Sequence, residues 1–199
     1  HTLLDNELKK VNYFSENEID SIYNCKHQFS GKIHNKNVVI IILESFSKEF
    51  VGYYNNGKGY TPFLDSLIPH SLVMENAYSN GIKSIEALPS ITASIPTLMN
   101  DPFITSSYAN NKYKSLANIL KNEGYTSSFF HGGTKGTMGF YQFSKKAGFD
   151  NYFGMEEYRN MNDHDGSWGI YDEPFFEYFS EHLRKEKQSL HPALQSNFK

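Results

Sequence analysis

The longest uninterrupted apolar stretch of the chain is residues 38–43, a run of valine, isoleucine and leucine that ends at Glu44. Short, continuous, β-branched runs are typical of strands that are buried on both faces of a parallel sheet. A second strand is predicted at residues 125–130, directly before His131 and two glycines. Residues 72–78 also have a strand-like composition, so a third strand is expected there.

Helical patterns fill the segments between these strands. Thr61 and Ser115 are predicted N-caps, Pro62 suits a first helical position, and Ser15 marks a further helix start near the N-terminus. The predicted helices cover residues 62–68, 84–94, 115–124, 139–147 and 172–182, and a proline at position 89 is expected to shorten or kink the second. The succession of strands and helices predicts an α/β domain with a mainly parallel sheet flanked by helices.

Composition narrows the possible classes of protein. The 199 residues include 19 Lys+Arg and 22 Asp+Glu, a net charge of −3, which argues against a nucleic-acid binder because such proteins usually carry a basic surplus. Cys25 is the one cysteine, so an intramolecular disulfide and a cysteine-based zinc cluster are both excluded. The six-residue apolar run is far shorter than the ~20 residues that cross a bilayer.

Four residues lie at positions where catalytic or ligand-binding groups are expected. Glu44 and His131 each follow a predicted strand, and ligands of open α/β sheets gather at the carboxyl ends of strands. Ser84 opens a predicted helix, where the positive end of the helix dipole favours phosphate and an alkoxide. Lys83 adds a positive charge beside it. Each residue also has an ordinary interpretation: a loop carboxylate, a turn histidine, a helix N-cap and a solvated lysine.

Five segments occur together in an order and spacing that carry a family resemblance. They are NVVIIILESFS at 37–47, YTPFLDS at 60–66, SNGIKSIEALPS at 79–90, KYKSLANILKNEG at 112–124 and FFHGG at 129–133. In this pattern the chain resembles the lipoteichoic acid synthase-like branch of the sulfatase families, within the alkaline phosphatase superfamily. The resemblance covers about residues 36–182 and implies an alkaline-phosphatase-like fold that is incomplete in this chain.

The resemblance also implies roles for individual residues. Glu44 matches a metal-ligand carboxylate, Ser84 matches a nucleophile that also binds the metal, and His131 matches a histidine of the substrate-phosphate pocket. The implied reaction is phosphoryl transfer through a covalent phospho-serine, with a divalent cation (manganese, magnesium or zinc) as cofactor. Lys83 is then placed to bind the substrate phosphate.

Three departures from the family pattern qualify this interpretation. Ser84 lacks the proline two residues on and the arginine four residues on that mark formylglycine sulfatases, which disfavours a sulfuric ester hydrolase. Residues 134–140 lack the tryptophan and arginine that grip glycerol phosphate in lipoteichoic acid synthases, so another phospholipid head group or phosphodiester is equally plausible. The family's second pair of metal ligands, Asp-His after a strand, is absent, since Asp163-His164-Asp165 is interpreted as a turn.

We therefore expect three segments: a lead-in at residues 1–35, the N-terminal part of a catalytic domain at 36–182, and a tail at 183–199. The parent protein is expected to be a membrane-anchored extracytoplasmic phosphotransferase or phosphodiesterase that acts on a phospholipid or envelope polymer. Its membrane segments would lie outside this chain, and this chain alone would be inactive. The alternatives are a non-catalytic module that binds an envelope glycan or lipid head group, and a sulfuric ester hydrolase.

Overall fold

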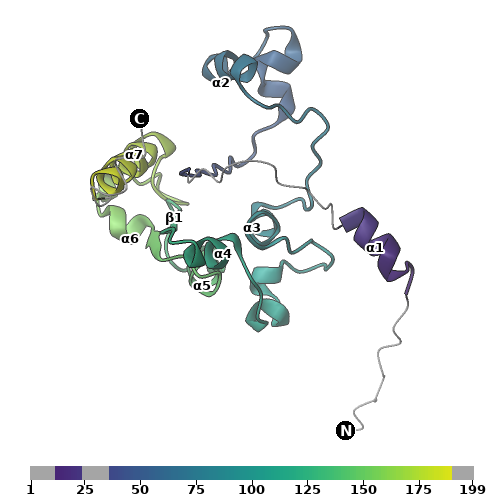
Figure 1. Ribbon diagram of the computed structural model, residues 1–199. Helices are drawn as coiled ribbons and strands as arrows, with labels where there is room; N and C mark the ends of the chain where they lie inside the picture. The colour runs from purple at the N-terminus through teal and green to yellow at the C-terminus, as the bar shows by residue number, and fades with distance from the viewer. Residues whose placement is uncertain (1–11, 24–35, 190–199) are drawn as a thin grey trace. The chain divides into compact units, whose positions relative to one another are not determined.

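The computed structural model in Figure 1 describes residues 12–23 and 36–189 of the chain. The chain divides into two compact units, residues 1–43 and residues 44–199, and each is described here by itself. Most of the predicted lead-in, including Cys25, lies outside the described residues, as does the end of the predicted tail at 190–199.

In the first unit, helix α1 (Glu16–Tyr23) begins where Ser15 predicts it. The Ser15 N–H donates to Glu18 Oε2 at 2.8 Å, and the Glu18 N–H donates to Ser15 Oγ at 3.3 Å. This reciprocal pair is a capping box, which satisfies two N–H groups that a helix start leaves without partners.

The prediction of a buried strand at residues 38–43 is wrong for this structure. These residues are extended but belong to no strand, and their side chains are 40–70% exposed. A strand that is buried on both faces needs neighbours beside it and layers above and below it. Within the described ranges, the sheet consists of two strands, and this run is not one of them.

The sheet of the second unit consists of β1 (Ser128–Phe130) and β2 (Asn151–Phe153). The two strands are parallel, with Ser128 opposite Asn151 and Phe130 opposite Phe153. Helix α5 (Phe140–Lys146) lies between them in the sequence, so the three elements form a βαβ unit. The predicted strand before His131 and the predicted parallel character of the sheet are thus confirmed, although the strand is shorter than predicted. Its partner is β2, which the sequence pattern did not predict, and not the run at residues 38–43.

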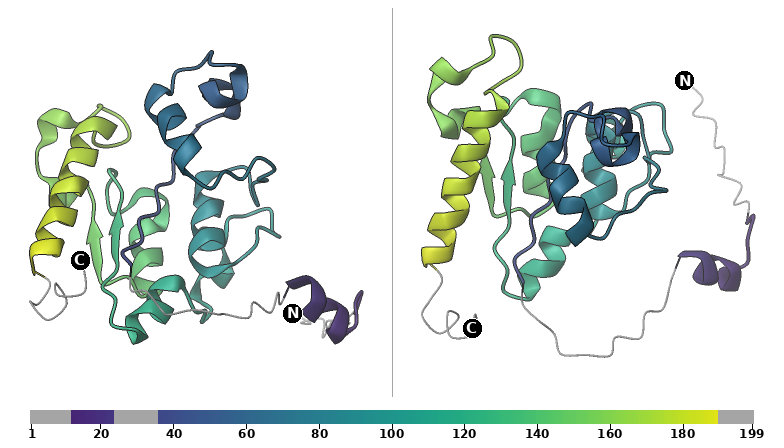
Figure 2. Two further views of the ribbon diagram at one scale, coloured as in Figure 1. Left: turned by 45° about the horizontal axis from the view of Figure 1, so that its top comes forward. Right: turned by 90° about the horizontal axis from the view of Figure 1, so that it is seen from above.

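Aromatic side chains cover both faces of this small sheet, because successive strand residues point to opposite sides. On one face, Phe129 stacks on Tyr152 with ring centroids 5.5 Å apart, and Tyr152 meets Tyr141 of α5 at 5.2 Å. On the other face, Phe130 stacks on Phe153 and also contacts Phe179 of helix α7 (Asp172–Ser189) at 4.9 Å. Both views in Figure 2 show the strands between α7 on one side and helices α3 (Ser84–Ala93) and α5 on the other.

The remaining helices are α2 (Pro62–Leu67), α3 (Ser84–Ala93), α4 (Leu116–Asn122) and α6 (Met155–Tyr158). Three of them lie close to the predicted ranges, and the fourth, α6, was not predicted. Single 3₁₀ turns lie at Lys48–Phe50, Gly52–Asn55, Ile68–His70, Phe103–Thr105, Ser107–Asn110, Thr137–Gly139 and Met161–Asp163. Helix α7 continues past residue 182, where the sequence pattern predicts its end. Within the described ranges, no helix has the length and apolar character that crossing a membrane requires.

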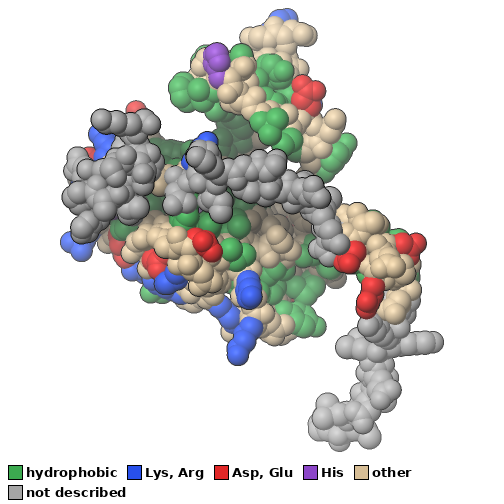
Figure 3. Space-filling view, viewed as in Figure 1, with side chains coloured by type: hydrophobic (Ala, Val, Ile, Leu, Met, Phe, Trp, Pro, Cys, Tyr) green, Lys and Arg blue, Asp and Glu red, His purple; other side chains and the backbone are tan. Residues whose placement is uncertain are grey.

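The predicted strand at 72–78 is also wrong. These residues form irregular backbone with a turn at positions 75–76, and Leu72 and Tyr78 are almost fully exposed. Hydrophobic side chains are likewise exposed around α2, including Tyr60 and Phe63. Figure 3 shows green hydrophobic side chains on the surface of this part of the chain. An apolar composition without a partner strand does not form a ladder, because each backbone N–H needs an acceptor on a neighbour.

Ser115 joins two helices of the second unit. Its buried hydroxyl accepts the Asn118 N–H at 3.2 Å, which caps α4, and it donates to the Ala147 carbonyl at the end of α5. The main core lies beside this junction and consists of Ile85, Leu88, Phe140, Phe143 and Ala147.

Replacing Ser115 by alanine should destabilise the fold by about 1–3 kcal/mol. The change removes a helix cap and leaves a buried carbonyl without its donor. Chemical denaturation of wild type and Ser115→Ala measures this difference. Ser107→Ala, which alters an exposed serine, is the control and should lie within about 0.5 kcal/mol of wild type. Equal stability of Ser115→Ala and Ser107→Ala would contradict the proposed bridge.

Candidate functional site

Ser84 is the first residue of α3, and the N-cap position is occupied by Lys83. The sequence-based alternative that Ser84 is an N-cap is therefore wrong. The Ser84 side chain is half-buried, and within the described ranges its hydroxyl has no hydrogen-bond partner. The start of the helix is instead closed by Glu86, whose Oε2 accepts the N–H groups of Ile82 at 2.8 Å and Lys83 at 3.1 Å.

Helix α3 holds this serine on a rigid element. Ile85 and Leu88 are buried in the core, and Pro89 is fully buried. The helix runs without interruption from Ser84 to Ala93, so Pro89 does not end it. Because Ile85 is anchored in the core, the neighbouring Ser84 has little freedom to move away from this position.

His131 directly follows β1, as predicted. Its N–H donates to the Phe153 carbonyl at 3.0 Å, which continues the sheet ladder by one bond. The imidazole meets the Phe140 ring edge to face with centroids 4.8 Å apart, and its buried Nδ1 has no hydrogen-bond partner among the described residues. Burial lowers the pKa of His131, so the imidazole is neutral near pH 7.

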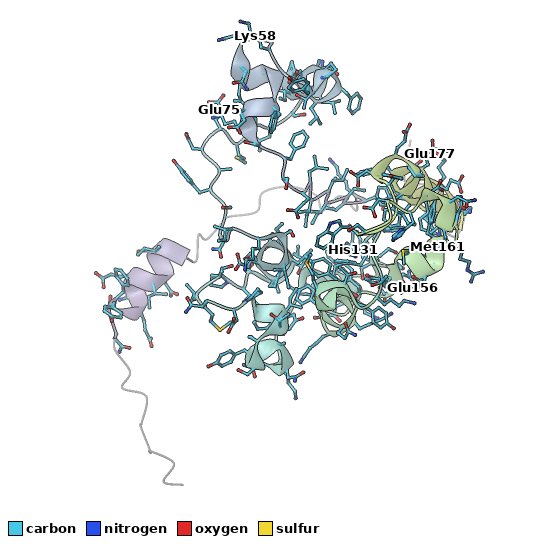
Figure 4. All side chains as sticks on the ribbon, turned by 180° about the vertical axis from the view of Figure 1, so that it is seen from behind. Lys58, Glu75, His131, Glu156, Met161 and Glu177 are labelled. Atoms are coloured by element: carbon cyan, nitrogen blue, oxygen red, sulfur yellow. The ribbon has the colours of Figure 1, made fainter. Side chains whose placement is uncertain are left out.

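The two glycines after His131 are fixed by segments far along the chain. The Gly132 carbonyl accepts the Ile170 N–H at 2.9 Å, and the Gly133 carbonyl accepts the Met155 N–H at 3.1 Å. A side chain at position 133 would put its Cβ 2.6 Å from His131 Cε1, so only glycine leaves room for the imidazole. In Figure 4 His131 lies on the α3 side of the sheet, whereas Glu156 and Met161 lie toward the periphery.

Phe140 links the two candidate residues. It belongs to the same buried core as Ile85, the neighbour of Ser84, and its ring also supports the imidazole of His131. The start of α3 and the end of β1 are therefore built on one hydrophobic core.

Glu44 and Lys83 are not part of the packed core that supports Ser84 and His131. Both side chains are exposed, and within the described ranges no hydrogen bond or ion pair connects either of them with Ser84 or His131. Glu44 is the first residue of the second unit, directly after the extended run at 38–43. Ser45, the next residue, has a positive φ of 52°, a backbone conformation that is uncommon outside glycine.

Sequence reasoning missed Glu86. A glutamate at the third helical position is the signal of a capping box, but lysine at the N-cap hides the usual serine or threonine of that motif. Residues 163–165 follow no strand, as predicted, but they are not a simple turn: Asp163 ends a 3₁₀ turn, and His164 pairs with Ile170 in an isolated antiparallel bridge. Asp165 Oδ1 accepts the N–H groups of Ser167 and Trp168 at 2.7 Å each, which also lowers the pKa of the Asp165 carboxyl.

Comparison with known proteins decides the family. Residues 36–196 match the family model described as Sulfatase. The chain belongs to the sulfatase family. It is 30% identical over 198 residues to lipoteichoic acid synthase 1 of Bacillus subtilis, an alignment that covers 92% of this chain and 30% of that protein. It is also 28% identical over 167 residues to lipoteichoic acid synthase 2 of the same species, covering 81% of this chain and 25% of that protein.

Solved structures agree with this membership. A protein of the alkaline phosphatase superfamily from Vibrio parahaemolyticus matches with a TM-score of 0.64 and 26% identity, over 72% of this chain and 35% of that one. The lipoteichoic acid synthase LtaP from Listeria monocytogenes matches in fold with a TM-score of 0.59 and 18% identity, over 67% and 32%. The predicted alkaline-phosphatase-like α/β fold is confirmed, and the chain spans about a quarter to a third of the relatives it matches.

The oxygen atoms that the family resemblance assigns to a metal site in this chain are of the kind that a hard divalent cation prefers. They are too few to complete the coordination of such an ion. A carboxylate at Glu44 and a hydroxyl at Ser84 are oxygen ligands of the kind that magnesium and manganese prefer. Such ions take about six ligands. Within the described ranges, no group of three or more His, Cys, Asp or Glu side chains is placed to hold a metal ion.

We predict that the 199-residue chain binds manganese weakly or not at all, because two donors make too few bonds for a tight site. Isothermal titration of the chain with manganese chloride measures this, with Glu44→Gln as the control for binding through that carboxylate. Sub-micromolar affinity in wild type would contradict the prediction and would require further ligands within the chain.

The buried state of His131 predicts a pH dependence of stability. Its pKa is lowered in the folded chain and returns to an ordinary value of about 6.5 on unfolding, so below that value the unfolded chain binds more protons. Stability should therefore fall as the pH drops from 7.5 to 5.5. Thermal unfolding at both pH values should show a smaller loss in His131→Phe than in wild type. The exposed His70→Gln is the matched control, and an unchanged pH dependence in His131→Phe would refute the assignment.

Proposed function

We propose that the parent protein is a phosphotransferase or phosphodiesterase that acts on phospholipid head groups or envelope-polymer phosphodiesters, with Ser84 as its nucleophile. The observation that carries this proposal is the unengaged hydroxyl of Ser84 at the first position of α3. A serine at a helix start normally serves as a cap, but here Glu86 performs that task. The similarity to proteins named lipoteichoic acid synthase supports the same class of substrate.

The chemistry follows from the position of the serine. Ser84 Oγ attacks the phosphorus of a phosphodiester and gives up its proton, the bond from phosphorus to the leaving group breaks, and the leaving oxygen takes up one proton, so that an alcohol departs and the serine is phosphorylated. A second alcohol or water then attacks the phospho-serine and releases Ser84. The positive end of the α3 dipole stabilises the negative charge that gathers on the phosphoryl oxygens.

His131 and Lys83 are proposed to bind the substrate phosphate. A neutral imidazole donates one hydrogen bond and accepts another, so His131 orients a phosphate oxygen without adding charge. The exposed ammonium group of Lys83 supplies the positive charge. A divalent cation held by Glu44, Ser84 and further ligands would lower the pKa of the serine hydroxyl and neutralise phosphate charge.

We place this reaction outside the cytoplasm, in a parent protein anchored to the membrane through segments outside this chain. This placement rests on the family resemblance. Residues 134–140 offer neither tryptophan nor arginine, so a substrate other than glycerol phosphate remains part of the proposal.

One observation favours a second candidate. Because the described residues bring together no complete set of metal ligands, a non-catalytic module that binds an envelope glycan or lipid head group accounts for the same chain. Turnover by the parent protein separates the two functions.

Replacing Ser84 by alanine in the parent protein should abolish phosphodiester cleavage, with a loss of several powers of ten, because a covalent route needs its nucleophile. Stability should change by no more than about 0.5 kcal/mol, since the hydroxyl caps nothing. Ser84→Thr should keep partial activity because it keeps a hydroxyl at the same site.

Cleavage of bis(p-nitrophenyl) phosphate in the presence of manganese is the assay. Near-normal turnover by Ser84→Ala would show that this serine is not the nucleophile. No turnover by the wild-type parent protein would favour the non-catalytic module.

A further inference from the structure

Glu86 is an unusual residue to find beside a candidate nucleophile. Its side chain is 7% exposed, and within the described ranges no lysine, arginine or histidine forms an ion pair with it. A buried carboxylate without a cationic partner is costly unless hydrogen bonds hold its charge. The two donors that hold it are the Ile82 and Lys83 N–H groups, both directed at Oε2.

Gly81, which directly precedes Ile82 and Lys83, leaves space for the Glu86 carboxylate. A Cβ on Gly81 would lie 2.5 Å from Glu86 Oε2, 2.8 Å from Glu86 Cβ and 3.0 Å from Thr97 Oγ1. Each distance is shorter than or at the limit of a tolerable contact, so any side chain at position 81 would push the carboxylate away from its two donors. Glycine at this position and glutamate at position 86 are therefore parts of one arrangement.

A second set of hydrogen bonds fixes Asn80, at the start of the segment that leads into α3. Asn80 Oδ1 accepts the Thr97 N–H at 2.5 Å and the Ser90 hydroxyl at 3.4 Å. The segment from Asn80 to Lys83 is thus joined to the body of α3 and to the chain that follows it. Its last residue is covalently bonded to Ser84, so the backbone direction at Lys83 sets where the Ser84 side chain begins.

We propose that Glu86 is a positioning residue, whose carboxylate fixes the Ile82–Lys83 backbone and thereby aims the hydroxyl of Ser84. This inference rests on the proposed role of Ser84 as nucleophile. Catalytic groups must be held close to their productive geometry by neighbours whose own positions are fixed, and a displacement of 1 Å costs about 10²-fold in rate. Glu86 meets this requirement without touching substrate, because both of its hydrogen bonds go to backbone.

The experiment compares variants of the parent protein with bis(p-nitrophenyl) phosphate and manganese. Glu86→Ala should lower kcat by about 10²-fold and change KM by less than about threefold, because substrate contacts remain while the nucleophile is misdirected. Glu86→Gln should lose less than about threefold in kcat, since the amide oxygen still accepts both N–H groups. Glu75→Ala, which removes an exposed glutamate visible in Figure 4, is the matched control and should behave as wild type.

Gly81→Ala tests the same positioning of the Glu86 carboxylate by displacing it instead of removing it. Its added Cβ should displace the Glu86 carboxylate and reproduce the loss in kcat, and the double variant Gly81→Ala/Glu86→Ala should be no worse than Glu86→Ala alone. Circular dichroism establishes that each variant is folded. If Glu86→Ala does not fold, Gly81→Ala and Glu86→Gln still decide the question.

Failure of this inference is distinct from failure of the proposed function. Wild-type kcat in Glu86→Ala or Gly81→Ala, beside an inactive Ser84→Ala, overturns the positioning role and leaves the nucleophile in place. A loss in Glu86→Gln as large as that in Glu86→Ala also overturns it, because the amide preserves the acceptor. Full turnover by Ser84→Ala overturns the proposed function itself.

Discussion

Aromatic packing on both faces of the β1–β2 pair is the interaction on which the rest of the second unit depends. Two short strands are at best marginally stable alone, because they bury too little apolar surface. Here Phe129 and Tyr152 pack toward α5, while Phe130 and Phe153 pack toward α7. The sheet is stable because α5 and α7 cover its two faces. The end of β1 in turn fixes the position of His131, which directly follows this strand.

The same core orients α3. Phe140 is packed with Ile85 and Leu88 on one side and supports the imidazole of His131 on another. A substitution that alters Phe140 would therefore move both candidate residues at once. Glu44 and Lys83 are exposed, so within the described ranges this core supports Ser84 and His131 but neither of the other two candidate residues.

Local signals predicted much of the fold, because they depend on residues close in sequence. Ser115 and Asn118 form the predicted start of α4, Pro62 opens α2, and Phe130 ends a strand directly before His131. Residues 38–43 could not be judged in this way. Their apolar run describes the environment of a strand between neighbours, and the described residues supply no neighbour for it. The alternative that Ser84 is an N-cap is wrong because Glu86 closes the helix start through a contact that only the folded turn creates.

The central proposal is that Ser84 and His131 belong to one phosphate-binding site in the parent protein, to which Glu44 contributes a metal ligand. Diffraction from manganese-soaked crystals of that protein, recorded to locate manganese by its anomalous signal, tests it most directly. The account predicts one ion coordinated by the Glu44 carboxylate and the Ser84 hydroxyl, with His131 facing the same phosphate site. An ion bound elsewhere, or one coordinated by neither Glu44 nor Ser84, would contradict it.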